Sequence, residues 1–220
     1  MGTETDAQQG GLLRLFNPRD ELAIWSNRLP HWQQDGSTVF VTFRLADSLP
    51  QHLLAPWQEA RDAWRVRHPP PWNDALEREF HERFSAPVDR WLDAGHGACL
   101  LRAAACAEAV AAVLRHDEDK ACRHLAWVVM PNHMHAVFTL REASTLDRVL
   151  KTWKGVSARR INELCGRSGA LWQRDYFDRL VRDETHLARC VRYIRRNPEK
   201  AGLRPGEYLL FESEAAQRLT

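Results

Sequence analysis

The chain has 220 residues, of which 44% are hydrophobic and 27% are charged, so it has enough apolar side chains for a packed core and is not a disordered polypeptide. The formal net charge of +2 neither indicates nor excludes a polyanionic partner. The five cysteines are odd in number and never spaced as CxxC, which argues against a disulfide framework and against a zinc knuckle.

The start of the chain and its hydropathy indicate where the protein works. No apolar run is long enough to span a bilayer, and residues 1–11 lack the apolar segment of a signal peptide. Free cysteines without a pairing pattern fit a reducing compartment. We therefore expect a cytoplasmic protein with no membrane partner.

Positive charge is concentrated in the last third of the chain. From Arg148 to Arg204 there are 15 Lys and Arg against 6 Asp and Glu, so the rest of the chain is acidic overall. A basic region on a nearly neutral protein is typical of a surface that binds a polyanion. The same charges could also form an ordinary solvated surface.

The first half of the chain predicts an arm, one strand and several helices. Residues 1–36 show little periodicity and predict an irregular N-terminal arm. The β-branched and aromatic run at 39–45 predicts an interior strand. Pro50 begins an amphipathic helix that runs towards Arg67 and is stopped by the prolines at 69–71. A further helical segment at about 74–93 belongs to a predicted insertion at about 67–95, and the alanine-rich segment 103–115 predicts another helix.

The second half predicts a hairpin, two helices and a strand. Apolar runs at 125–130 and 136–140 flank Pro131 and Asn132 and predict a β-hairpin. Apolar spacing at 146–164 predicts a helix, and 171–181 a short strand. The last helix begins near Glu184 and is expected to end before Pro198, because the residue ahead of a proline avoids the α region. This order predicts an α+β fold, an antiparallel sheet covered by helices, with extra helical material after the first strand.

Two histidines at the start of the second hairpin strand could bind a metal ion. His133 and His135 are alternate residues, so their side chains point to the same face of a sheet, while Met134 points to the other. Two imidazoles on one face can converge on a single cation. A histidine pair near a turn can equally be structural, so the motif depends on what accompanies it.

A tyrosine in the last predicted helix accompanies the histidines. Tyr193 precedes Asn197 by four residues, which places a phenol and a carboxamide on one helical face. Both could approach the same metal. Alternatively, Tyr193 could anchor the helix in the core and Asn197 could cap its end. Tyr176 is a second candidate nucleophile, but it lies beside Phe177 in a predicted strand and lacks an amide partner four residues on.

This set of side chains suits phosphodiester chemistry. A divalent cation held by two imidazoles and an amide oxygen can polarise a phosphodiester and neutralise developing negative charge. A phenol can serve both as nucleophile and as leaving group, so a phosphotyrosine link is reversible. Nitrogen and oxygen ligands without a thiolate favour Mg²⁺ or Mn²⁺.

At this point the sequence resembles the single-tyrosine transposases with a His-hydrophobic-His (HUH) motif, and among them the REP-associated tyrosine transposases. The resemblance covers roughly residues 29–203. It rests on separate blocks in the family's order: 31–32 with 39–45, AWVVMPNHMH at 126–135, WK at 153–154, LWQRDYFD at 171–178, and YIRRNPEKAGL at 193–203. The region 67–95 is longer than in compact members, and the tail lacks a tryptophan-rich ending.

The resemblance implies a ferredoxin-like catalytic domain at 37–203, followed by a C-terminal tail at 204–220. It implies that His133, His135 and Asn197 bind the metal and that Tyr193 is the covalent nucleophile. It further implies recognition of single-stranded hairpin DNA of the REP type, and cleavage that leaves a 5′-phosphotyrosine and a free 3′-hydroxyl. Some relatives are dimers that share tyrosines, so the protein could be a monomer or a homodimer.

Basic and aromatic side chains supply candidate DNA contacts. Arginines can bind phosphates, and an indole can stack on an unpaired base. The candidates are Lys151, Lys154, Arg159, Arg160, Trp172, Arg174, Arg192, Arg195 and Arg196. Two other functions remain open: a metal-dependent phosphoesterase in which water replaces the tyrosine, and a domesticated protein that binds DNA hairpins without cutting them.

Overall fold

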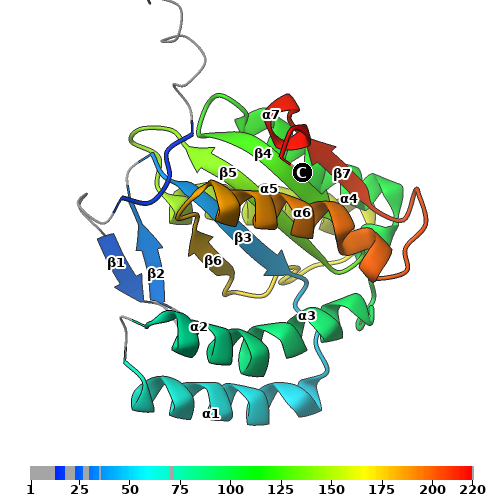
Figure 1. The fold of residues 1–220 in the computed structure, drawn as a ribbon. Coiled ribbons are helices and arrows are strands. Elements are labelled where there is room, and N and C mark those ends of the chain that lie inside the picture. The colour runs from blue at the N-terminus through cyan, green and yellow to red at the C-terminus, as the bar shows by residue number, and fades with distance from the viewer. Residues whose placement is uncertain (1–12, 18–22, 27–29, 35, 70–71, 220) are drawn as a thin grey trace, which may run out of the picture.

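The computed structural model describes residues 13–17, 23–26, 30–34, 36–69 and 72–219. A five-stranded sheet with the order β6-β3-β5-β4-β7 forms its centre (Figure 1). Its strands are β3 (Thr38–Arg44), β4 (Cys122–Val129), β5 (His133–Leu140), β6 (Phe177–Leu180) and β7 (Leu209–Glu212). All four neighbouring pairs are antiparallel, which confirms the predicted α+β fold.

Helices cover both faces of this sheet. Helices α4 (Ala104–Asp117) and α5 (Leu146–Leu164) pack on one face, and α6 (Glu184–Lys200) and α7 (Glu214–Gln217) pack on the other (Figure 1). Because side chains alternate along a strand, Met134 joins the core under α4 and α5, whereas Val137 joins the core under α6. The candidate site lies on the α6 face.

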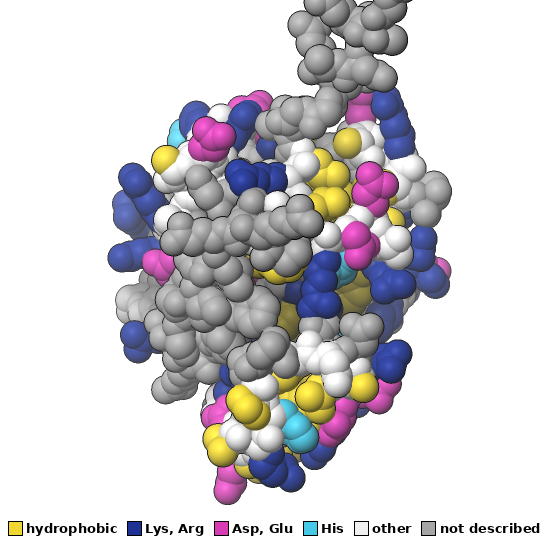
Figure 2. Space-filling view, turned by 60° about the vertical axis from the view of Figure 1, so that its left-hand side comes forward, with side chains coloured by type: hydrophobic (Ala, Val, Ile, Leu, Met, Phe, Trp, Pro, Cys, Tyr) yellow, Lys and Arg dark blue, Asp and Glu magenta, His cyan; other side chains and the backbone are white. Residues whose placement is uncertain are grey.

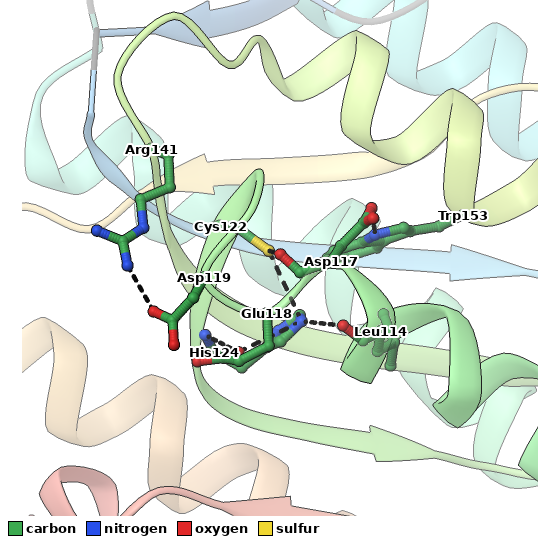
Figure 3. A network of polar contacts seen from close by, with 8 residues as sticks. All are labelled: Leu114, Asp117, Glu118, Asp119, Cys122, His124, Arg141 and Trp153. Atoms are coloured by element: carbon green, nitrogen blue, oxygen red, sulfur yellow. Dashed lines mark hydrogen bonds and ion pairs between the residues drawn. The ribbon is translucent and has the colours of Figure 1, made fainter.

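On the opposite face of the sheet, the buried His124 makes contacts that hold the fold together. His124 Nε2 lies 3.0 Å from the carbonyl oxygen of Leu114 and 3.6 Å from Cys122 Sγ (Figure 3). In the same corner, Trp153 Nε1 donates to Asp117 at 2.8 Å. These contacts tie β4 to the end of α4 and to α5. Desolvation lowers the pKa of His124 to about 4, so this imidazole is neutral at pH 7.

Extra helical material follows β3, the first strand of the central sheet. This helical insertion starts before its predicted bounds of about 67–95: it comprises α1 (Gln51–Arg67), α2 (Asp74–Phe80), a π-helical turn (His81–Ser85) and α3 (Ala86–Asp93), and a 3₁₀ turn (Leu100–Arg102) leads into α4 (Figure 1). The insertion has its own aromatic cluster, in which Trp64 contacts the rings of Phe80 and Phe84. The Trp64 indole also donates to Glu79 at 2.8 Å. The helices therefore form a small packed unit next to the sheet.

The structure corrects the predicted end of the last helix. Helix α6 continues through Pro198 to Lys200. Proline removes one backbone donor and disfavours α geometry in the residue before it, but here it falls in the final turn, where few helical bonds remain. Ala201 N still donates to the carbonyl oxygen of Asn197 at 3.0 Å and so closes the helix.

Other boundaries also differ from the expectations. The strand expected at 171–181 is reduced to β6, with Trp172 contributing only an isolated bridge to Leu45. The predicted tail at 204–220 contains β7, which pairs with β4 and forms an edge of the sheet. Within the predicted arm at 1–36, β1 (Ala23–Ser26) pairs with β2 (Pro30–Gln33), so the arm is not wholly irregular. The rest of the prediction for the arm, at residues 1–12, 18–22, 27–29 and 35, lies outside the described residues. None of the helices in the described part of the chain has the length and apolar character that crossing a bilayer requires.

Candidate active site

The two histidines of the HxH motif lie side by side at the beginning of β5. Their ring centroids are 4.7 Å apart, and each residue is only 1% exposed. The strand register pairs Arg44 with His133 and Thr42 with His135, so these four side chains share one face of the sheet. The alternation predicted from the sequence therefore brings both imidazoles to the α6 side.

Asn132 fixes the orientation of the His133 ring. Its amide nitrogen donates to the carbonyl oxygens of Leu92 and His96, at 3.3 and 3.1 Å. The amide oxygen must then face His133 Nδ1, which lies 2.7 Å away. Because an amide oxygen only accepts, Nδ1 carries the proton and Nε2 presents its lone pair to the site.

A hydroxyl holds the second histidine in a similar way. Thr42 Oγ1 lies 2.6 Å from His135 Nδ1, and the Phe40 ring stacks on the imidazole with a centroid distance of 5.7 Å. The other nitrogen, Nε2, faces Asn197, whose Nδ2 is 3.5 Å away. Side chains on β3 therefore orient this ring, and its Nε2 points towards Asn197 of α6.

Helix α6 brings the tyrosine and the asparagine to the histidines. The ring of Tyr193 meets that of His135 edge to face, with centroids 5.0 Å apart. Asn197 lies one turn further along the helix and is 1% exposed. The four side chains that the sequence singles out as nucleophile and metal ligands thus lie together within one chain. Burial raises the pKa of Tyr193 above its ordinary value, and the negative charges of Asp89 and Asp93 raise it further.

Two buried polar atoms in this cluster suit a cation. His133 Nε2 and Asn197 Oδ1 have no hydrogen-bond partner among the described residues. Leaving such atoms buried and unpaired costs about 1–3 kcal/mol each, so their convergence requires an explanation. Burial lowers the pKa of His133 to about 3 and that of His135 well below its ordinary value, which keeps both imidazoles in the neutral form that binds metals.

The donor set differs from that of most protein metal sites. No group of three or more His, Cys, Asp and Glu side chains suited to a metal occurs among the described residues. A cation on His133 and His135 would therefore take its third protein ligand from the amide oxygen of Asn197. Nitrogen and oxygen donors without thiolate suit a hard or borderline divalent ion.

Tyr193 lines a cavity of about 1170 Å³ between the sheet and the helical insertion. Figure 2 shows Lys and Arg side chains beside a recess that has hydrophobic side chains at its bottom. Arg44 also lines the cavity, and desolvation lowers its pKa to about 10, so it stays charged at neutral pH. Arg44 was not among the site residues predicted from the sequence. A charged residue two positions after Thr42 in a buried strand could have indicated it, because alternate residues share one face of the sheet.

The insertion contributes a second residue that sequence reasoning missed. Asp89 on α3 lines the same cavity as Tyr193, and burial raises the pKa of its carboxyl group to about 6. One turn later, Asp93 binds Lys200 of α6 at 2.8 Å. No motif marks these acids, because each lies 100 or more positions before Tyr193 in the sequence.

The predicted DNA contacts on α5 lie away from this cluster. Lys151, Arg159 and Arg160 are exposed on a helix that covers the opposite face of the sheet. Lys154 donates to the carbonyl oxygens of Gln173 and Arg174, at 2.6 Å each, so its ammonium group holds this loop. Burial lowers the pKa of Lys154 to about 8.

Trp172 does not offer a stacking surface, which corrects its assignment as a DNA contact. It is 6% exposed, its ring packs edge-on against Phe43 at 4.7 Å, and its Nε1 donates to Ser157 at 2.9 Å. The neighbouring Arg174 is exposed. An aromatic residue beside a charged loop residue suggested stacking, but the side chain belongs to the core.

The predicted contacts on α6 divide into two kinds. Arg192 and Arg196 are exposed next to Tyr193. Arg195 instead binds Glu212 at 2.8 Å and the carbonyl oxygen of Ala216 at 3.2 Å, so it joins α6 to β7 and α7. Its charge serves the fold of the C-terminal segment.

Comparison with known proteins shows what the central part of the chain is similar to. Residues 102–197 match a protein-family model described as "Transposase IS200 like", a stretch that contains both histidines, Tyr193 and Asn197. The chain is 30% identical over 91 residues to a REP-associated tyrosine transposase of Escherichia coli (strain K12), which covers 41% of this chain and 53% of that protein. The chain therefore spans about half the length of this relative.

A solved structure adds a weaker likeness. A REP-associated tyrosine transposase bound to a REP hairpin aligns with 80% of this chain and 75% of its own, at 21% identity and a TM-score of 0.44. The family match is the firmer finding, and it lies on the elements that carry the cluster. Residues 102–197 of this chain are thus similar to the IS200-like transposase family.

Proposed function

We propose that this protein is a DNA transposase that cleaves and rejoins single-stranded DNA at hairpins of the REP type, with Tyr193 as its nucleophile. The family match and the REP-associated relative support the class of reaction. The observation that carries the proposal is local: the Tyr193 ring lies 5.0 Å from that of His135, and Asn197 faces the same imidazole.

His133, His135 and Asn197 are the proposed ligands of Mg²⁺ or Mn²⁺, through Nε2, Nε2 and Oδ1. The unpaired, buried His133 Nε2 and Asn197 Oδ1 support this assignment. When bound, the cation would polarise the scissile phosphate and neutralise charge that develops on it. Asn132 and Thr42 would then act by holding the two rings in place.

The reaction exchanges one phosphodiester for another. The Tyr193 oxygen attacks phosphorus, the bond from phosphorus to the 3′-oxygen breaks, and the products are a 5′-phosphotyrosine and a free 3′-hydroxyl. Attack by a 3′-hydroxyl reverses these steps and releases the phenol. Because the covalent link retains the energy of the diester, rejoining needs no external energy source.

Several positively charged side chains lie where they would hold a DNA strand in the cavity beside Tyr193. Arg44 lines this cavity, and Arg192 and Arg196 are exposed on the helix that carries the nucleophile. We propose these three, together with Arg174, as phosphate contacts. Lys151, Arg159 and Arg160 would contact DNA only where a strand or hairpin extends to the α5 face. Tyr193 and the histidines come from one chain, so the proposed site is complete within a protomer.

The test compares wild-type protein with Tyr193→Phe, using single-stranded hairpin oligonucleotides copied from the repeats that flank the gene, with Mn²⁺. We expect the wild type to cleave the DNA and form a covalent adduct on a denaturing gel, and the variant to bind the DNA without either product. Cleavage by the variant would instead indicate hydrolysis by a phosphoesterase. Hairpin binding by the wild type without an adduct in any divalent metal would indicate a DNA-binding protein.

A further inference from the structure

The cavity beside Tyr193 has two walls, and the helical insertion forms one of them. Helices α1, α2 and α3 and the π-helical turn line one side, and the sheet and α6 line the other. The insertion ends before residue 102, where the match to the transposase family begins. The role of this wall therefore does not follow from the family.

Helix α1 contributes three residues to the cavity at a spacing of four positions. Trp57, Arg61 and Arg65 all line it, and residues four apart lie one above the other on one face of a helix. We call these three residues the α1 stripe. The Arg61 guanidinium lies 4.8 Å from the centre of the Trp57 ring, and Trp57 Nε1 donates to the carbonyl oxygen of Phe84 at 3.1 Å. The partly exposed indole is therefore held in one position in the cavity wall.

Arg65 presents a positive charge that no neighbouring acid pairs with. Its side chain forms no hydrogen bond or ion pair with another described residue, whereas Arg61 binds Asp62 at 2.7 Å. The Arg65 guanidinium lies 6.0 Å from the centre of the Phe80 ring, which leaves its N–H groups for a further partner. Because two arginines one turn apart repel each other, an anion bound beside them would stabilise this part of the helix.

The lining of the cavity suits an unpaired nucleic-acid strand. It contains six arginines and three aspartates, without lysine or glutamate, so its charge favours a polyanion. Aromatic rings from both walls lie among these charges, Trp57 and Phe80 from the insertion and Phe177 from β6. Arginines interleaved with aromatic rings are typical of surfaces that bind single strands, because unpaired bases expose faces that can stack. In a duplex, neighbouring base pairs cover those faces.

We infer that the α1 stripe binds the unpaired nucleotides that flank the scissile phosphate. Arg65 contacts a phosphate of this strand, and a base stacks on Trp57, which Arg61 supports. This inference rests on the proposed function, because Tyr193 lines the same cavity and the scissile phosphate must reach it. It goes beyond that function because it gives the insertion a substrate-binding role and places the single-stranded flank, not the paired stem, against α1.

The test measures how much the unpaired flanks contribute to binding. Fluorescence anisotropy in EDTA, which prevents cleavage, compares two oligonucleotides copied from the repeats that flank the gene. One is the hairpin alone, and the other carries about ten unpaired nucleotides on each side of it. The ratio of the two affinities is the flank contribution, and we expect the wild type to bind the flanked oligonucleotide more tightly.

Arg65→Ala should lower the flank contribution and reduce the salt slope of log affinity for the flanked oligonucleotide by about 0.7, the value for one phosphate contact on a single strand. Arg67→Ala is the matched control. It removes the same charge from the same helix, but Arg67 is exposed and does not line the cavity. This control should keep the wild-type slope and flank contribution.

Two variants of Trp57 isolate the stacking. Trp57→Leu and Trp57→Phe both lose the hydrogen bond to Phe84, but only Trp57→Leu lacks an aromatic ring. Trp57→Leu should lower the flank contribution by about fivefold or more, and Trp57→Phe by less than about threefold. Unchanged affinity for the hairpin alone shows that a variant is folded. If Trp57→Leu does not fold, the comparison of Arg65→Ala with Arg67→Ala decides.

The outcomes separate this inference from the proposed function. A wild type that binds both oligonucleotides equally, or a flank contribution unchanged in Arg65→Ala, would overturn the role of the α1 stripe. An equal loss of affinity for both oligonucleotides in Arg65→Ala would overturn it too, because α1 would then contact the stem. Adduct formation by the wild type with Mn²⁺ is measured separately, and its absence would overturn the proposed cleavage.

Discussion

The amide oxygen of Asn132 lies 2.7 Å from Nδ1 of His133, while its amide nitrogen is held by two backbone carbonyls. This arrangement leaves the Asn132 amide one orientation and His133 one tautomer. Partners of this kind hold metal-binding imidazoles in place, and their removal commonly costs 10–100-fold in metal affinity. Asn132 thus connects the insertion to the proposed ligand set.

Asn132→Ala is therefore expected to weaken Mn²⁺ binding by about 10–100-fold, because the His133 ring loses the partner that fixes its tautomer. Isothermal titration calorimetry of the purified protein measures this effect. Asn162→Ala is the matched control, since Asn162 lies on α5, across the sheet from the site, and its amide donates to the Gly169 carbonyl oxygen. Equal Mn²⁺ affinity in wild type and Asn132→Ala would refute the role assigned to this contact.

A second prediction concerns Trp172 as a core residue. Trp172→Ala should lower the free energy of unfolding by about 3–5 kcal/mol, because it opens a cavity beside Phe43. Trp172→Phe should cost about 1 kcal/mol, since Ser157 keeps its bond to the Trp153 carbonyl oxygen at 2.6 Å. Urea denaturation gives both values.

The same variant tests the abandoned stacking interpretation. Trp172→Phe should bind hairpin DNA with wild-type affinity, because the indole faces the core. A marked loss of DNA affinity in a stably folded Trp172→Phe protein would restore Trp172 as a nucleic-acid contact.

Local periodicity was enough to predict how the proposed catalytic side chains are grouped. The two-residue period of a strand places His133 and His135 on one face, and the four-residue spacing of a helix places Tyr193 above Asn197. The structure brings the two pairs together as the spacing suggested. Their roles stay predictions, because geometry alone does not test metal binding or nucleophilic attack.

Long-range packing explains what the sequence did not predict. Asp89 and Tyr193 line one cavity because α3 packs near α6, where the Asp93–Lys200 ion pair joins the two helices, and no local pattern encodes that packing. Strand β7 has only four residues, and its assignment depends on pairing with β4. Trp172 was predicted as a DNA contact because its neighbours in the sequence are polar, but its neighbours in space belong to the core.

The salt dependence of DNA binding should reveal which face the DNA occupies. Each lost phosphate contact reduces the slope of log affinity against log salt by about 0.7–0.9. We expect the double variant of Arg192 and Arg196 to alanine to lower the slope by about 1–2. The matched control is the double variant of Arg159 and Arg160 to alanine on α5, which should lower the slope less. A larger effect of the α5 pair would place the DNA on that face.

His124 should make folding stability depend on pH in a way that a variant can isolate. Desolvation lowers its pKa in the folded protein to about 4, against about 6.5 in the unfolded chain. As the pH falls from 6.5 towards 4, the unfolded chain gains a proton that the folded protein does not, so the free energy of unfolding decreases. The contribution is complete above pH 6.5 and amounts to about 3 kcal/mol, because each pKa unit corresponds to about 1.4 kcal/mol.

The measurement compares wild type with His124→Phe by urea denaturation in EDTA at pH 7, 6, 5 and 4. His133 and His135 titrate in the same direction, but both proteins contain them, so their effect cancels in the difference. The stability of the wild type relative to the variant should therefore fall by about 3 kcal/mol over this range. Parallel stability curves would mean that His124 already titrates normally in the folded protein, and that the contacts with Leu114 and Cys122 do not keep it neutral.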